Sequence, residues 1–95
     1  MNLQDHLLTI LSEECSEVIK EVSKSLRFGL KDFHPKYDNI PNDQRISNEL
    51  CDLIAMVEML QDEGVIPELS RDKIEYKKEK VKKYMEYSKK MGKLT

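Results

Sequence analysis

Tryptophan is absent from this 95-residue sequence, and glycine, proline and cysteine are scarce, with 3, 3 and 2 residues. No run of about 18 apolar residues exists, so the sequence offers no membrane-spanning helix. Asp5 and Glu13 interrupt the N-terminal segment before the apolar core of a signal peptide could form. We therefore predict a cytoplasmic protein that has no membrane partner.

The two cysteines, Cys15 and Cys51, lie within apolar helical patterns, where a free thiol behaves as a small hydrophobic side chain. They lack the CxxC spacing of a zinc site, and the only imidazoles belong to His6 and His34. The sequence therefore predicts packed thiols, no disulfide and no zinc site.

The composition, 39% hydrophobic and 36% charged, is ordinary for one small globular domain. We predict a single domain over residues 1–95, with a thin core that oligomerisation helps to complete. The net charge of −2 hides an asymmetry, because residues 1–67 carry 13 acids and 6 bases while residues 68–95 carry 5 acids and 10 bases. The basic segment contains regularly spaced glutamates and no nucleic-acid motif, so we predict no nucleic-acid partner and interpret it as a solvated helix face or one that docks on an acidic subunit.

Apolar spacing predicts three helices. Steps of three and four residues indicate a first helix over 3–26, with Gly29 just beyond its end. A second helix is expected from Asn42 or Asp43 to about Gln61, and a third from Pro67 or Ser70 to about Met91. The intervening residues 29–43 contain prolines and asparagines and are predicted to form a loop. The predicted fold is all-α, a three-helix protomer that forms half or more of a four-helix bundle completed by oligomerisation.

Two of these helices carry an apolar stripe, and the other is apolar nearly all round. The first helix presents Leu7, Leu11, Cys15, Val18, Val22 and Leu26. The third presents Ile74, Val81, Tyr84, Met85, Ser88 and Met91, our candidate for much of a subunit interface, with packing inside one chain as the alternative. The second is expected to be buried on most sides, which draws attention to its acids Glu49 and Asp52.

Acidic residues gather on both of the first two helices. Glu13, Glu14, Glu17 and Glu21 share one arc of the first helix, and Glu49 and Asp52 share a face of the second. A solvated acidic face, offset by Lys20 and Lys24, is one interpretation of the first group. The second group lacks such partners, since residues 46–70 contain six acids and no lysine or arginine.

Converging carboxylates need a counter-ion, because two unit charges about 4 Å apart repel by roughly 4 kcal/mol at an effective dielectric of 20. Oxygen ligands favour Mg²⁺ or Mn²⁺ over zinc or copper. A di-iron bundle would need Glu-x-x-His pairs, which the sequence lacks. Because Mg²⁺ commonly bridges carboxylates to phosphates, the pattern suggests phosphate hydrolysis or binding.

Glu13-Glu14-Cys15-Ser16-Glu17 followed by Glu49-Leu50-Cys51-Asp52 resembles the EExxE…ExxD signature of the MazG-like all-α nucleotide pyrophosphohydrolases. The resemblance covers about residues 7–62 and is closest to the short stand-alone MazG-like proteins of phages and bacteria. The spacer of 31 residues between Glu17 and Glu49 is longer than is usual in that family.

The resemblance implies hydrolysis of a nucleoside triphosphate between its α and β phosphates, giving a monophosphate and pyrophosphate. It implies Glu14, Glu17, Glu49 and Asp52 as ligands of Mg²⁺, for which Mn²⁺ could substitute. Glu13 is placed behind these ligands or near the attacking water. The resemblance also implies a homodimer or homotetramer, in the cytoplasm of the host if a phage encodes the chain.

Loop residues supply candidates for binding the nucleotide. We expect Arg27, Lys31 and Lys36 to contact the triphosphate. Phe33, His34 and Tyr37 are candidates for stacking on the base, with simple loop packing as the alternative. A dUTPase-like or alarmone-cleaving specificity fits the same metal site. The alternative from another class is a catalytically weak nucleotide-binding or regulatory module, or a helical interaction module with solvated acids.

Overall fold

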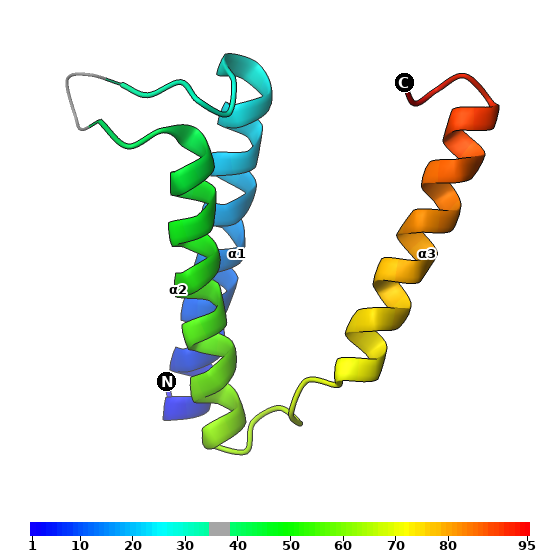
Figure 1. Ribbon diagram of the computed structural model, residues 1–95. Coiled ribbons are helices and arrows are strands. Elements are labelled where there is room, and N and C mark those ends of the chain that lie inside the picture. Colours follow the sequence, from blue (N-terminus) through cyan, green and yellow to red (C-terminus); the bar gives the residue numbers. More distant parts are fainter. Residues whose placement is uncertain (35–38) are drawn as a thin grey trace.

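A computed structural model describes residues 1–34 and 39–95 of the chain. It contains three α-helices, α1 (Leu3–Phe28), α2 (Asn42–Asp62) and α3 (Arg71–Lys90), and the described residues form no strand (Figure 1). The predicted all-α class and the three helices are confirmed. No helix in this part of the chain is long and apolar enough to cross a membrane.

Local signals explain where the helices begin and end. The side chain of Asn2 accepts a hydrogen bond from the amide of Asp5 at 2.8 Å, and Ser70 caps α3 in the same way through the amide of Lys73 at 3.2 Å. Gly29 ends α1 at a φ of 104°, a conformation that disfavours other residues. The cap of α2 differs from the prediction, because Pro41 precedes it and no side chain caps it.

The helices α1 and α2 pack side by side as an antiparallel hairpin (Figure 1). The apolar core lies at the end of the hairpin near the N-terminus and contains Leu7, Met56 and Leu60. Four partly buried residues pack against it: Ile10, Leu11, Val65 and Ile66. At the loop end Ser25 and Asn42 are buried instead, and the Asn42 side chain donates to the Gly29 carbonyl at 2.9 Å.

The buried face of α1 follows the predicted stripe at Leu7 and Leu11 and departs from it towards the loop end. Val22 and Leu26 are 39% and 84% exposed, whereas Glu21 and Ser25 are 4% and 7% exposed. Leu7 and Glu21 lie fourteen residues apart, two steps of the seven-residue repeat at which packed helices meet. The predicted stripe advanced by nearly four residues per step, so it drifts away from α2 towards the loop end.

Two other predictions about burial are wrong for the single chain. Cys15 and Cys51 are both exposed. The helix α2 is not buried on most sides, since Leu50, Ile54 and Met59 are 41%, 46% and 48% exposed. The reason is that α1 covers one side of α2, while α3 packs against neither helix in the part of the chain described.

Candidate metal centre

A layer of carboxylates lies between the two ends of the hairpin. On α1, Glu14, Glu17 and Glu21 follow one another at steps of three and four, so they lie on the side that meets α2. On α2, Glu49 and Asp52 lie three residues apart and midway between Asn42 and Leu60. The antiparallel packing of the two helices therefore brings the two acidic groups together.

Three of the four predicted ligands come together. One carboxylate oxygen from each of Glu14, Glu49 and Asp52 lies within 4.8 Å of the other two. Glu14 and Glu49 are half-buried, and Asp52 is exposed. Octahedral Mg²⁺ has oxygen ligands at about 2.0–2.1 Å, which places those oxygens roughly 3 to 4 Å from one another. The three carboxylates offer oxygen donors of the kind that hard divalent cations prefer, and the 4.8 Å limit on their spacing is wider than octahedral ligands require.

Glu49 has a raised pKa because of its place in this cluster. Burial raises the pKa of this carboxyl above its ordinary value, and the neighbouring charges raise it further. Those charges belong to Asp52, Glu14, Glu17 and Glu21, in that order of effect. These carboxylates repel one another, and a bound cation would relieve that repulsion.

Glu17, the fourth predicted ligand, is half-buried and lies outside the group of three. Its charge nevertheless contributes to the raised pKa of Glu49, so it lies close to the same centre. Glu13 is exposed and is also outside the group, and its backbone carbonyl accepts a hydrogen bond from Ser16 Oγ at 2.7 Å.

Glu21 belongs to this layer, although it was not among the predicted site residues. The residue is 4% exposed, and Lys24 Nζ lies 3.3 Å from Oε1 and 3.2 Å from Oε2. The contact with Oε2 is a charge contact without hydrogen-bond geometry, so this buried oxygen has no hydrogen-bond donor among the described residues. The signal in the sequence was the seven-residue step from Glu14, which puts both residues on the face that meets α2.

The two predicted phosphate-binding cations that the structure describes, Arg27 and Lys31, lie at the loop end. Arg27 is six residues beyond Glu21, about 9 Å along the helix axis, and its guanidinium carbon lies 4.8 Å from the centre of the Phe28 ring. Lys31 forms an ion pair with Asp43, and a hydrogen bond from the ammonium group is the main cause of the lowered pKa of Asp43.

The remaining loop residues are only partly described. Phe33 is 44% exposed and His34 is exposed, so both rings are accessible in the single chain. Lys36 and Tyr37 lie outside the described residues. The predicted site for the base therefore stays a prediction.

No protein-family model, curated protein or solved structure matches this chain.

Proposed function

We propose that the chain is a Mg²⁺-dependent nucleoside triphosphate pyrophosphohydrolase that acts as a homodimer or homotetramer. The reaction adds water across the bond between the α and β phosphates of a ribo- or deoxyribonucleotide and releases a monophosphate and pyrophosphate. The observation that carries the proposal is the meeting of Glu14, Glu49 and Asp52 from two helices within 4.8 Å. A solvated acidic face on one helix would not bring these three residues together.

The carboxylates have separate roles in this proposal. Glu14, Glu17, Glu49 and Asp52 would hold the cation between the helices, and its positive charge would offset part of their mutual repulsion. Bound Mg²⁺ would neutralise phosphate oxygens and acidify a bound water. A carboxylate that is not a ligand accepts the proton of the attacking water, and Glu13 is our candidate.

The cations of the loop end orient the substrate. Arg27 and Lys31 are exposed there, and with Lys36 they would bind triphosphate oxygens that extend from the carboxylate layer. Phe33, His34 and Tyr37 would contact the base. Holding the phosphates and the water in one geometry supplies much of the rate enhancement in such a reaction.

A second candidate function is a helical interaction module in which the acids bind no substrate. The observation in its favour is the apolar surface of α2 and α3, where Leu50, Ile54 and Val81 are each more than 40% exposed. This candidate predicts binding to another helix and no release of pyrophosphate.

The test is release of pyrophosphate from a panel of NTPs and dNTPs with Mg²⁺. Wild type is compared with Glu17→Gln and Asp52→Asn, and Asp62→Asn serves as a matched control because it makes the same change at an exposed position of α2. We expect the two site variants to lose at least about 100-fold in kcat/KM and the control to keep full activity. Full activity in Asp52→Asn, or no release from any nucleotide, would refute the proposed enzyme.

A further inference from the structure

One side of α2 is uncovered and apolar. This outward face is made of Ser47, Leu50, Cys51, Ile54, Ala55 and Glu58, which line an open groove. It lies away from the side of α2 that meets α1, where Met56 and Leu60 are buried. Within this face Ser47 and Ile54, and likewise Cys51 and Glu58, lie seven residues apart, the spacing that suits packing against another helix.

The helix α3 has an apolar stripe that is also largely uncovered, with Ile74 and Ser88 half-buried. None of its residues is buried, and Val81, Tyr84 and Met85 are 41%, 61% and 45% exposed. Ile74, Val81 and Ser88 again follow at intervals of seven. The chain therefore presents two helical faces of matching repeat, and neither is packed in the part of the chain described.

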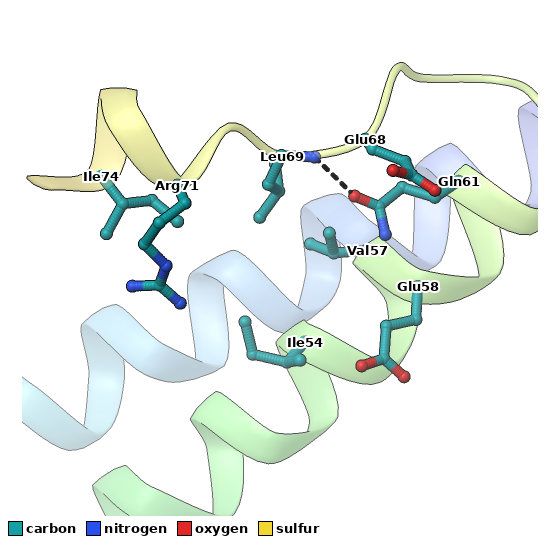
Figure 2. Close-up of a pocket in the computed structure, with 8 residues that line it drawn as sticks. All are labelled: Ile54, Val57, Glu58, Gln61, Glu68, Leu69, Arg71 and Ile74. Carbon is teal, nitrogen blue, oxygen red and sulfur yellow. Dashed lines mark hydrogen bonds between the residues drawn. The ribbon is translucent and has the colours of Figure 1, made fainter.

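The linker between α2 and α3 is tied to the end of α2. The amides of Val65 and Ile66 donate to the Leu60 carbonyl at 2.9 and 3.4 Å, and both side chains pack against the core. The amide of Leu69 donates to Gln61 Oε1 at 2.8 Å (Figure 2). Beyond this linker α3 runs away from the hairpin, and the two form the arms of a V (Figure 1).

The groove at the base of this V is lined from both sides. Ile54 and Val57 of α2 lie on one wall, and Leu69 and Ile74 lie on the other (Figure 2). The helices α2 and α3 do not pack on each other. The groove between them is therefore open and offers room for an apolar partner.

The exposed area has the size of a stable interface. The chain exposes 7828 Å², whereas a compact monomer of this mass exposes about 5,700 Å². The Cα radius of gyration is 17.0 Å, against about 12 Å for a compact chain of this length. The excess of roughly 2,100 Å² per chain lies within the range that obligate homodimers bury per subunit.

Charge indicates which surfaces meet. Residues 1–67, which include α2, carry 13 acids and 6 bases, and residues 68–95, which include α3, carry 5 acids and 10 bases. Pairing α2 with α2, or α3 with α3, would bring like charges together. Pairing α3 with α2 brings opposite charges together.

We infer that the occupant of the V is a second copy of this chain, and that α3 of each copy packs its apolar stripe on the outward face of α2 of the other. The exchange is reciprocal, as a two-fold dimer requires. It covers both faces without breaking the hydrogen bonds that hold the linker, whereas closure of α3 onto its own α2 would have to reorient that linker. The inference specifies the contact within the proposed oligomer and does not depend on the proposed reaction.

The experiment measures the molar mass of the full chain by light scattering after gel filtration, without metal or nucleotide. We expect at least twice the 11.2 kDa of one chain. Ile54→Glu on α2 and Val81→Glu on α3 are each expected to weaken association by at least about tenfold, because each places a charge in the apolar contact. Ile54 is 46% exposed and Val81 is 41% exposed in the single chain, so neither change disturbs the hairpin core. Circular dichroism checks the helix content of each variant.

Two variants serve as matched controls. Met59→Glu alters a residue of α2 that is 48% exposed but lies away from the outward face, and Tyr87→Glu alters α3 at 59% exposure off its stripe. Each adds the same charge to the same helix, so we expect the wild-type mass from both. A monomeric wild type would overturn the inference, as would an assembly that withstands either interface variant or is dissociated equally by the controls.

Discussion

Replacing Glu49 with glutamine should stabilise the metal-free protein, although Glu49 is a proposed ligand. Oxygens of Glu14, Glu49 and Asp52 lie within 4.8 Å of one another. Two unit charges at that distance repel by about 0.9 kcal/mol at the dielectric of water and by roughly four times as much at a dielectric of 20. Because Asp52 is exposed, the lower figure applies. Removing the two repulsions that involve Glu49 should raise the free energy of unfolding by about 1 to 2 kcal/mol in low salt.

The sign of the pH dependence follows from the raised pKa of Glu49. Above its ordinary value of 4.5 and below its folded pKa, this carboxyl holds more proton in the folded than in the unfolded state. The stability of the wild type therefore falls as the pH rises through that window. Glutamine has no such proton, so the advantage of Glu49→Gln should be largest near pH 7.5, should shrink as the pH falls through that window, and should vanish only below pH 4.5.

The assay is urea unfolding of wild type and Glu49→Gln at several pH values, with the divalent cations removed by a chelator. Asp62→Asn, at an exposed position of the same helix, should change stability by less than about 0.5 kcal/mol. If Glu49→Gln destabilised the metal-free protein at every pH, Glu49 would not be repelled by its neighbouring carboxylates, which would contradict the proposed arrangement of the layer.

Two further predictions concern the core and the cation. Leu60 is fully buried, so Leu60→Ala should lower the free energy of unfolding by about 2 to 5 kcal/mol in urea; a loss below about 1 kcal/mol would show that the hairpin core is packed differently. Mg²⁺ at one hundred times its dissociation constant should raise the free energy of unfolding by about 2.7 kcal/mol, with less gain at lower pH because protons compete for Glu49. An equal gain in Asp52→Asn would place the binding elsewhere.

The positions of the helices were accessible from the sequence. Their bounds follow from apolar spacing and from local signals such as Asn2, Gly29 and Ser70, which act within a few residues of where they lie. The convergence of Glu14, Glu49 and Asp52 could also be expected, because each pair or trio of acids shares a helix face and the motif joins the two helices.

The sequence did not show which face of α1 meets α2, nor the direction in which α3 leaves the hairpin. A stripe of Leu7, Val22 and Leu26 is as good a helical pattern as the seam through Leu7, Glu21 and Ser25, and only the packing of α2 selects the second. An apolar pattern shows that a helix face is to be covered, but it does not show whether the same chain or another chain covers it. Cys51 and Ile54 are exposed in the single chain because no other helix of the same chain covers their side of α2.

The most direct test of the central claim is a phosphorus NMR spectrum of a nucleoside triphosphate incubated with the protein and Mg²⁺. Our account predicts that the triphosphate signals are replaced by those of a monophosphate and pyrophosphate, and that a chelator or Asp52→Asn prevents the change. Formation of a diphosphate and inorganic phosphate, or an unchanged spectrum for every nucleotide tried, would contradict it.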